Sequence, residues 1–259
     1  MLIFKQLLCL LCLLPSLLFA QTWQAQSTNT QLSVLELFTS EGCGLCPAAD
    51  RWVATLPQQG VTDEQLIILG FHIDYLNDIK GWVDRFASPI FSDRQRQLAR
   101  LNLFQSIYTP EFVISGEVIH NWKKYTKEIV KAVNGFAPEA SISLNVIKEA
   151  DQLLVDTAIK VEGNENRQYS VLYFAVTEDD IISKVTGGDN AGATFHHQHL
   201  VRQWLGPFEL DSKGETNMST EIIINEQWNQ NKLKIVALVQ NLNDGFVLQG
   251  LSLPLSDKE

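Results

Sequence analysis

The sequence predicts two domains: an α/β domain over residues 32–137, followed by an all-β, sandwich-like domain over residues 140–256. A Cys-x-x-Cys motif stands between a strand-like run and a helical pattern, and a second apolar run follows it. Beyond residue 138 long helical patterns give way to strand-like segments separated by polar turns. With 259 residues, of which 45% are hydrophobic, the chain is long and apolar enough for two globular domains.

Residues 1–20 have the composition of a secretory signal peptide. One early cation, Lys5, precedes an apolar run over residues 7–19, which is shorter than the roughly 20 residues of a membrane-spanning helix. We expect cleavage after Ala20 or Ala25, with a retained membrane anchor as the alternative.

Loss of this segment leaves Cys43 and Cys46 as the remaining cysteines, because Cys9 and Cys12 leave with it. Lys5 is its one charged residue, so the net charge changes from −10 to −11. This acidic balance argues against nucleic acid and anionic membrane surfaces as partners. The sequence therefore predicts a periplasmic or secreted protein with no membrane attachment beyond the signal peptide. Its oligomeric state cannot be read from these features.

The α/β region is predicted from its apolar periodicity. A strand at residues 32–40 leads into the cysteine motif, and a helix with Pro47 in its first turn follows. Residues 65–74 are typical of a strand buried on both faces, and the strand–helix–strand order implies a parallel pair. The other predicted elements are an irregular insertion (75–89), a helix (91–104), a hairpin that turns at Ser115–Gly116, and a helix (121–136).

Six segments of the second half have the alternating or continuous apolar pattern of strands. They are residues 141–149, 152–161, 169–178, 218–225, 233–241 and 246–255. Together they predict a β-sandwich of roughly 120 residues. Residues 21–31 are polar and uncharged, and we expect them to form an N-terminal tail.

The order of elements in the first half resembles a thioredoxin fold, and the chain resembles a bacterial family of exported thioredoxin-like proteins catalogued as a domain of unknown function. The resemblance rests on "VLELFTSEGCGLCPAAD", "FHIDY" with "GWVDRFASPIFSDRQ", "YTPEFVISGE", "GDNAGATFHHQHLVR" and "IVALVQN" with "GLSLPL". These stretches occur in order between Val34 and Leu255. Leu76 is a departure, because the family often has an aromatic residue there. The family label names a fold and no substrate.

Cys43 and Cys46 are candidate catalytic residues for thiol–disulfide exchange. Cysteines three residues apart at the start of a helix lie roughly 5–6 Å apart between Cα atoms, within the range that a disulfide accepts. Cys43 would lie at the helix N-terminus, where unpaired N–H groups stabilise a thiolate. Cys43 then attacks a substrate disulfide, and Cys46 resolves the mixed disulfide. A stabilising cross-link is a weak alternative, because the closed loop is too short to remove much chain entropy.

Three further residues receive catalytic roles from the resemblance. Pro110 is expected to follow Thr109 in a cis peptide bond, and these two residues would dock an extended substrate against the dithiol. Glu36, in the middle of the first strand, would accept the proton of Cys46. A solvent-facing position or a salt bridge is the alternative for Glu36, because an unpaired buried carboxylate is costly.

Histidines provide the other candidates. His72 and Asp74 end a predicted parallel strand at the sheet edge that also carries Cys43, so they line the dithiol or cap the insertion after them. His197 and His199 alternate along the chain, a spacing that suits copper or zinc. The alternative for His197, which we favour, is a structural role at a domain interface.

The sequence favours an exported thiol–disulfide oxidoreductase that acts on a protein or small-thiol disulfide. It contains no motif for a nucleotide or another cofactor, and a tetra-thiolate zinc site is excluded within one chain because a second Cys-x-x-Cys is missing. Two alternatives remain open: a module that binds Cu(I) at the same dithiol, and a scaffold that binds a partner without catalysis. The direction of the redox reaction depends on a potential that the spacing does not encode.

Overall fold

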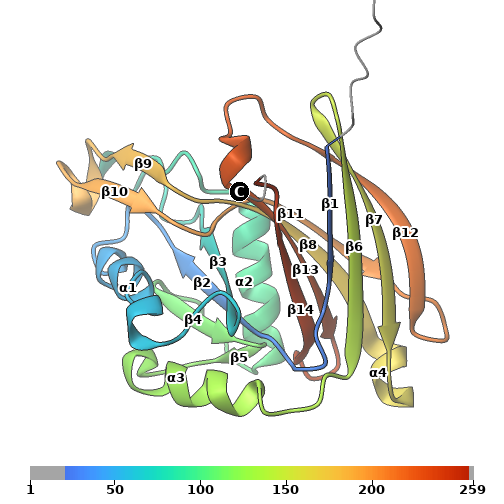
Figure 1. Ribbon diagram of the computed structural model, residues 1–259. Coiled ribbons are helices and arrows are strands. Elements are labelled where there is room, and N and C mark those ends of the chain that lie inside the picture. Colours follow the sequence, from blue (N-terminus) through green and yellow to red (C-terminus); the bar gives the residue numbers. More distant parts are fainter. Residues whose placement is uncertain (1–20, 257–259) are drawn as a thin grey trace, which may run out of the picture.

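The centre of the molecule is a mixed eight-stranded sheet, seen in a computed structural model that describes residues 21–256 (Figure 1). Its strands come from both halves of the chain. In spatial order they are β14 (Val247–Pro254), β13 (Leu233–Asn241), β8 (Ser170–Glu178), β11 (Leu200–Glu209), β3 (Leu66–His72), β2 (Ser33–Thr39), β4 (Glu111–Ile114) and β5 (Glu117–Val118). β3 runs parallel to both β2 and β11, and the other neighbours are antiparallel.

The expected fold class, an α/β thioredoxin-like domain followed by a separate all-β sandwich-like domain, is wrong. Strands hold 42% and helices 21% of the described residues, which makes this part of the chain mainly β. The sheet does not end at β3, because the Gly70 N–H donates to the carbonyl of His199 at 2.8 Å and Leu200 pairs with Gly70. The pairing with β11 covers a strand edge that a separate α/β domain would leave open.

A four-stranded antiparallel sheet packs across one end of the large sheet. Its strands, in spatial order, are β1 (Thr22–Gln26), β6 (Ala140–Glu149), β7 (Gln152–Val161) and β12 (Glu215–Ile223). Inward residues such as Leu144 and Val155 share a core with Phe174 and Ile235 of the large sheet. The expected N-terminal tail is therefore wrong in part, because Trp23 pairs with Val146 in the edge strand β1.

Helices cover both faces of the large sheet. α1 (Cys46–Val53) and α3 (Trp122–Val133) pack over the β2–β4 region through a core that includes Leu37 and Phe112. α2 (Pro89–Leu101) packs on the opposite face, against Phe38 and Phe71. The short α4 (Asn164–Tyr169) leads into β8. The predicted hairpin is confirmed, and its two turn residues have positive φ angles, 49° at Ser115 and 99° at Gly116.

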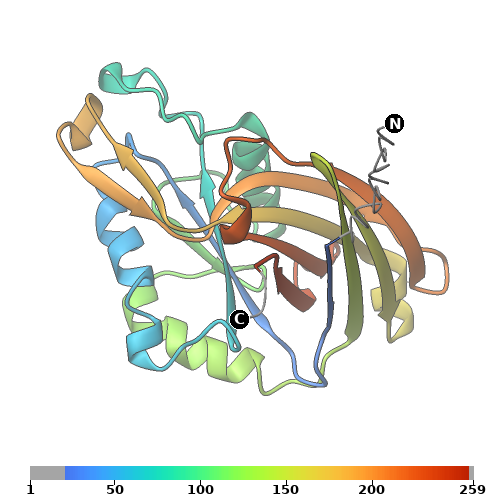
Figure 2. The ribbon, with the colours of Figure 1, turned by 45° about the horizontal axis from the view of Figure 1, so that its top comes forward.

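A two-stranded hairpin projects from the large sheet beside α1 and the loop that follows β3 (Figure 2). It consists of β9 (Ile181–Lys184) and β10 (Thr194–His197), which are antiparallel. The short 3-10 turns of the chain are η1 (Pro57–Gln59), η2 (Ile79–Gly81), η3 (Gly188–Asn190) and η4 (Gln230–Lys232). η3 forms the end of the hairpin and lies against η2.

All six strands predicted in the second half form, with ends that differ from the expected ones by no more than three residues. The predicted division of the chain between residues 137 and 140 falls in the connection from α3 to β6, and independent folding of the two parts stays a prediction. Within residues 21–256 no helix has the length and apolarity needed to cross a membrane. The predicted signal peptide lies outside the described residues.

Candidate functional site: a disulfide beside a buried acid–imidazole network

Cys43 and Cys46 form a disulfide at the start of α1, with their Cα atoms 5.4 Å apart. The pair follows directly from the end of β2, so the large sheet and the helix together fix its position. The Cys46 N–H donates to the Cys43 carbonyl at 3.3 Å and to Cys43 Sγ at 3.2 Å. Cys46 is fully buried, Cys43 is 7% exposed, and Leu45 between them is 73% exposed. The loop therefore turns an apolar tip outward while its sulfur atoms lie almost entirely inside.

Thr109 and Pro110 lie at the same end of β2 as the cysteines. Their peptide bond is cis, as expected. They immediately precede β4, whose Glu111 pairs with Phe38, so continuation of this register brings Pro110 beside Thr39. The Tyr75 hydroxyl, on the loop after β3, lies within hydrogen-bonding reach of the Thr109 side chain.

Glu36 does not lie beneath Cys46. Alternate residues of β2 face opposite sides of the sheet, and Leu35 and Leu37 face α1. Glu36 instead faces α2, where Arg94 Nη2 and Nε contact its two carboxylate oxygens at 2.7 and 2.8 Å. Both side chains are 1% exposed. The structure thus shows the salt-bridge alternative for Glu36.

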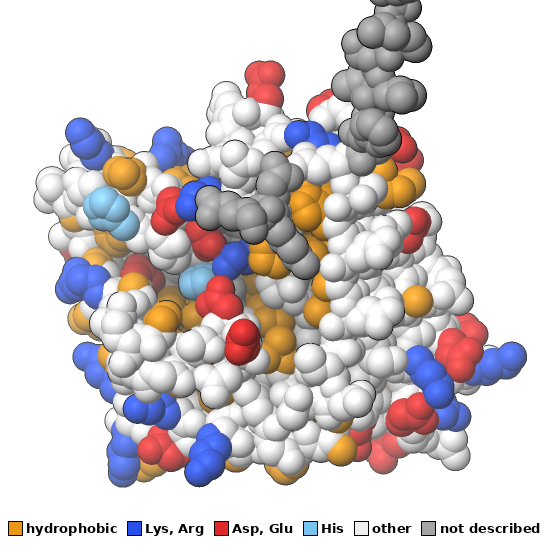
Figure 3. Space-filling model, viewed as in Figure 1, with side chains coloured by type: hydrophobic (Ala, Val, Ile, Leu, Met, Phe, Trp, Pro, Cys, Tyr) orange, Lys and Arg blue, Asp and Glu red, His pale blue; other side chains and the backbone are white. Residues whose placement is uncertain are grey.

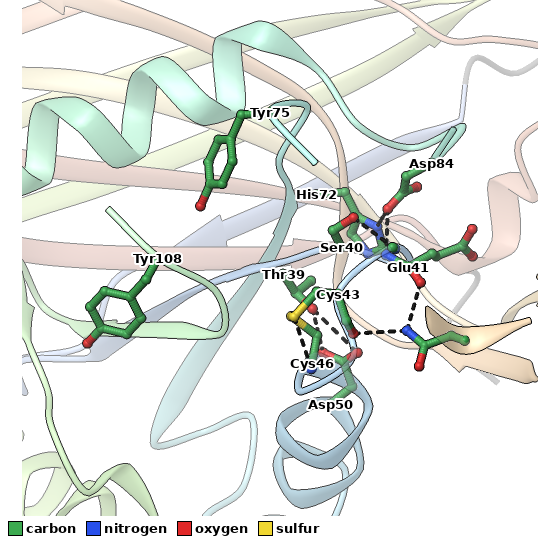
Figure 4. Close-up of a disulfide and its surroundings, with 12 residues drawn as sticks. Thr39, Ser40, Glu41, Cys43, Cys46, Asp50, His72, Tyr75, Asp84 and Tyr108 are labelled. Carbon is green, nitrogen blue, oxygen red and sulfur yellow. Dashed lines mark hydrogen bonds and ion pairs between the residues drawn. A yellow bond between two sulfur atoms is a disulfide. The ribbon is translucent and has the colours of Figure 1, made fainter. Parts of the chain in front are cut away.

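A buried network of two carboxylates and two imidazoles lies beside the Cys43 loop, and Figure 4 labels three of its members, Glu41, His72 and Asp84. Asp84 Oδ2 accepts the N–H of Glu41 at 2.8 Å and lies 2.7 Å from His72 Nδ1. Glu41 Oε1 lies 2.9 Å from His197 Nε2, and the two imidazole rings are 4.9 Å apart. All four side chains are buried. The network joins β3, the loop after it, β10 and the segment that leads into Cys43.

The pKa values of the two histidines are shifted in opposite directions because their neighbours differ. Burial disfavours the charged form of His72, but the adjacent Asp84 carboxylate outweighs burial and raises its pKa. Burial likewise opposes ionisation of Asp84, yet His72 holds the pKa of this carboxyl below its usual value. For His197 burial prevails over the hydrogen bond to Glu41 and lowers the pKa. The two imidazoles are thus shifted in opposite directions, His72 toward its charged form and His197 toward its neutral form.

Asp50 brings a titratable carboxyl to the same helix as Cys46. The two residues are four positions apart on α1, so their side chains share one face of the helix. Burial raises the pKa of Asp50 to about 6, although His72 and the Thr39 hydroxyl oppose this rise. Thr39 Oγ1 donates to Asp50 Oδ1 at 3.2 Å. This carboxyl is therefore ready to gain or lose a proton near neutral pH.

The cap on the Cys43 loop comes from the end of the β9–β10 hairpin. Asn190 Nδ2 donates to the carbonyls of Glu41 and Cys43 at 2.8 and 2.9 Å. A Cβ atom on Gly44 would lie 3.2 to 3.5 Å from the Asp189 side chain, so the two segments are in close contact. Residues about 150 positions away in the sequence thus hold the backbone of the dithiol loop.

The other predicted residues, Asp74, His196 and His199, do not belong to this buried network. Asp74 is not part of the network, because Ser92 of α2 donates to its carboxylate. His196 is exposed, and His199 Nδ1 lies 3.7 Å from an oxygen of Asp179. In residues 21–256 no group of three or more His, Cys, Asp or Glu side chains is arranged to hold a metal ion.

Sequence reasoning missed Asp50, Glu41 and Asp84. Asp50 had one usable signal, its spacing of four from Cys46 on a predicted helix. Glu41 and Asp84 had no local signal, because their partners come from distant segments. The structural role favoured for His197 agrees with its contact between the hairpin and the Glu41 segment.

A cleft of about 490 Å³ opens between α1 and β10, beside Asp50. Figure 3 looks onto this side of the molecule, where hydrophobic and histidine side chains show between α1 and the hairpin. The lining combines hydrophobic residues, Leu37, Val53, Ile68, Phe195 and Leu200 among them, with one carboxyl, Asp50, one guanidinium, Arg51, and the imidazoles of His72, His196, His197 and His199.

Comparisons with known proteins agree on a family and a fold. Residues 34–240 match the family described as "Protein of unknown function (DUF1223)", and the chain belongs to this family. No curated protein matches the chain. The crystal structure of protein AGR_C_4864 from Agrobacterium tumefaciens is similar with a TM-score of 0.60 and 21% identity, over 90% of this chain and 98% of that one. HBP35 of Porphyromonas gingivalis is similar with a TM-score of 0.68 and 16% identity, over 87% of this chain and 76% of that one. At these identities the likeness shows a shared fold.

Proposed function

We propose that this protein is an exported enzyme that exchanges disulfides with a protein or small-thiol substrate in the bacterial envelope. The observation that carries the proposal is the hydrogen bond from the Cys46 N–H to Cys43 Sγ, at 3.2 Å. After reduction, the same N–H favours a thiolate at Cys43, and the thiolate is the reactive form of cysteine. The proposal uses one feature shared with thioredoxin-like proteins, which is a cysteine pair between a strand and a helix.

The reaction runs in two displacement steps. The Cys43 thiolate attacks one sulfur of a substrate disulfide, a bond forms between the two sulfur atoms, and the other substrate sulfur leaves as a thiolate. The Cys46 thiolate then attacks Cys43 Sγ, which closes the Cys43–Cys46 disulfide and releases the second substrate thiolate. The substrate gains two electrons and the protein loses two, and the reverse sequence oxidises a dithiol substrate. Thr109 and Pro110 would dock the substrate.

In this mechanism Asp50 takes the place that the sequence suggested for Glu36. Cys46 is fully buried, so its thiol needs a nearby group to remove the proton before it can attack. Asp50 shares a helix face with Cys46 and titrates near pH 6, so at neutral pH it is mostly the ionised base. Glu36 is held by Arg94 on the other face of β2.

The reduction potential of the Cys43–Cys46 pair tests this proposal. We would equilibrate the mature protein against glutathione buffers and count free thiols by mass-tagging. We expect a reversible two-electron transition between about −120 and −270 mV, the span of known dithiol catalysts. A pair that never closes, or that stays oxidised well below about −300 mV, would overturn the proposal.

A trapping experiment assigns the attacking cysteine. Cys46→Ser should accumulate a mixed disulfide with glutathione at Cys43, because no second thiol is present to release it. Cys43→Ser is the matched control and should react far more slowly, because the remaining Cys46 is fully buried. Equal labelling of both variants would contradict the assigned order.

A further inference from the structure

A groove of about 430 Å³ lies between β9 and residues 82–85, which belong to the loop after β3 (Figure 2). The hairpin and the loop meet at one end, where a Cβ atom on Gly187 would lie 2.5 Å from the carbonyl oxygen of Gly81. At the other end Arg85 reaches across, and its Nη2 donates to the carbonyl of Ile182 at 3.4 Å. The two segments therefore run antiparallel, and the groove between them is bounded at both ends.

The edge of β9 that faces this groove has no strand partner among the described residues, because β9 and β10 form a sheet of two strands. On the opposite edge the Val185 N–H donates to the carbonyl of Ala193, just before β10. Backbone groups of successive residues alternate between the two edges of a strand, so those of Ile182 and Lys184 point away from β10. The contact between Arg85 and the Ile182 carbonyl agrees with this direction. The outer edge of β9 can therefore pair with an added strand.

The side chains around the groove are cationic and apolar. Its lining includes Arg85 and Lys184 and no carboxylate. Within residues 21–256 neither of these cations forms an ion pair. Ile182 and Val83, also in the lining, are 58% and 53% exposed. The whole chain carries a net charge of −10, but charges more than about 8 Å away are largely screened at physiological salt, so these two cations dominate the field in the groove.

We propose that this groove binds an extended acidic segment of a partner protein, which pairs with the outer edge of β9 and places carboxylates beside Arg85 and Lys184. Alternate side chains of a strand point to the same face, so two acidic residues separated by one other residue can face the two cations together. Main-chain hydrogen bonds to a strand edge supply affinity, and the side chains supply specificity. The proposal goes beyond disulfide exchange, because no thiol takes part in it.

Isothermal titration calorimetry of the oxidised protein with peptides tests the proposal. The probes are acetyl-Val-Glu-Ile-Glu-Val-amide and the same peptide with glutamine in place of both glutamates. In about 50 mM salt we expect one glutamate peptide to bind per chain, about fivefold more tightly than the glutamine peptide. In about 0.5 M salt this advantage should fall below about twofold, because exposed charges are then screened. Absence of saturable binding, or equal affinities of the two peptides in low salt, would overturn the proposal.

Two N-methylated forms of the glutamate peptide test the pairing with β9. One is methylated on the isoleucine nitrogen and the other on both glutamate nitrogens, so each form blocks one edge of the bound strand. At least one of them should bind about tenfold more weakly than the parent peptide. Full binding by both would show that the peptide does not pair as a strand. In the protein, Ile182→Pro removes an N–H that points away from β10, so it should weaken the parent peptide while the β9–β10 pairing persists.

A charge reversal assigns the cations. In the double variant Arg85→Glu with Lys184→Glu, a peptide with lysine in place of both glutamates should bind more tightly than the glutamate peptide. The matched control changes two other exposed lysines, Lys131→Glu with Lys213→Glu, and should retain the preference for glutamate. An unchanged preference in the first variant would contradict the site. A reversed preference is a gain of binding that an unfolded chain cannot give, and the methylated peptides still decide should this variant fail to fold.

Two further measurements identify the occupant. Glutarate that binds as tightly as the glutamate peptide would show that the site takes a small dianion, and would overturn the assignment to a peptide. A dimer in sedimentation velocity that Ile182→Pro dissociates would show that a second copy of the chain occupies the edge of β9, and would overturn the assignment to a partner. Because the peptides contain no cysteine, failure of these assays leaves disulfide exchange unaffected, and an inactive dithiol leaves the groove unaffected.

Discussion

The imidazole of His197 lies 2.9 Å from the carboxylate of Glu41, a residue two positions before Cys43. Glu41 has no exposed surface and His197 is 6% exposed, so this contact is made away from solvent. His197 belongs to β10, more than 150 residues further along the chain. The loop that carries the dithiol therefore depends on a contact from the opposite half of the chain.

Removal of this contact should destabilise the protein. In His197→Ala the buried Glu41 carboxylate loses its partner, and Glu41 Oε2 already has no hydrogen-bond partner among the described residues. A buried polar group left unpaired costs the full desolvation penalty, so we expect a loss of about 2 to 4 kcal/mol in the free energy of unfolding. Urea denaturation followed by circular dichroism measures this loss.

The neighbouring His196 provides the matched control, because it lies on the same strand with an exposed side chain. His196→Ala should change stability by less than about 0.5 kcal/mol. The additional change Glu41→Gln should recover part of the loss in His197→Ala, because a neutral amide costs less to bury than an unpaired carboxylate. Equal effects of the two histidine substitutions would show that the Glu41–His197 contact contributes little.

Asn190→Ala should make the disulfide easier to reach. Asn190 donates to the carbonyls of Glu41 and Cys43, and Cys43 is only 7% exposed beneath this cap. Loss of two hydrogen bonds of about 0.5 to 1 kcal/mol each should speed reduction by dithiothreitol about 5- to 30-fold. Thr194→Ala, at an exposed position of β10, is the control. A rate that is the same in both variants would mean that the hairpin does not limit access.

The local part of the fold could be predicted from the sequence. Alternation along residues 152–161, for example, was enough to predict β7, because four of its inward side chains, Leu153, Val155, Ile159 and Val161, belong to one core. β11 was missed because Arg202, Gly206 and Pro207 interrupt its apolar pattern. The predicted fold class was wrong because, without β11, the sequence shows no strand that joins the two halves of the chain in one sheet. Whether β3 is an edge strand depends on its pairing with β11, which is a long-range contact that periodicity does not record.

In the candidate site, too, the local features could be predicted and the long-range contacts could not. The cysteine pair was visible as a motif, and His72 followed from its place at the end of a parallel strand. The partner of His72 could not be predicted, because Asp84 reaches it through the fold of an irregular loop. Glu36 was assigned to the dithiol because the sequence leaves the face of a central strand undetermined, and the structure turns this face toward Arg94.

Glu36→Gln should therefore affect stability and leave the dithiol chemistry unchanged. The substitution leaves the guanidinium of Arg94, which is 1% exposed, without its anionic partner. Breaking one side of a buried ion pair costs about 3 to 5 kcal/mol, and we expect a loss of about 3 kcal/mol in urea denaturation. The pH dependence of Cys43–Cys46 closure should match that of the original protein in stopped-flow oxidation by glutathione disulfide. A displaced pH profile would place Glu36 in the proton-transfer path after all.

Asp50→Asn should stabilise the protein at neutral pH and have no effect in acid. The pKa of Asp50 is raised from 3.8 to about 6 by burial, so the folded state holds its proton to higher pH than the unfolded chain does. Stability is therefore lost as pH rises from about 4 to 6, and the loss is constant above this window. Each pKa unit corresponds to about 1.4 kcal/mol of stability. Because Asp50 is only partly buried, we expect less than the full value, and Asp50→Asn should raise the free energy of unfolding by about 2 kcal/mol at pH 7.5.

Urea denaturation at half-unit steps from pH 4 to pH 8 checks this prediction. The difference between Asp50→Asn and the original protein should be near zero at pH 4, grow through pH 6 and then remain level. Asp93→Asn should show no such growth, because the Asp93 side chain is 73% exposed and an exposed pair contributes less than about 1 kcal/mol. A difference that is constant over the whole range would show that the Asp50 carboxyl has the same pKa in the folded and unfolded states. The base that deprotonates Cys46 would then have to be sought among the other acids of the site, beginning with Glu41.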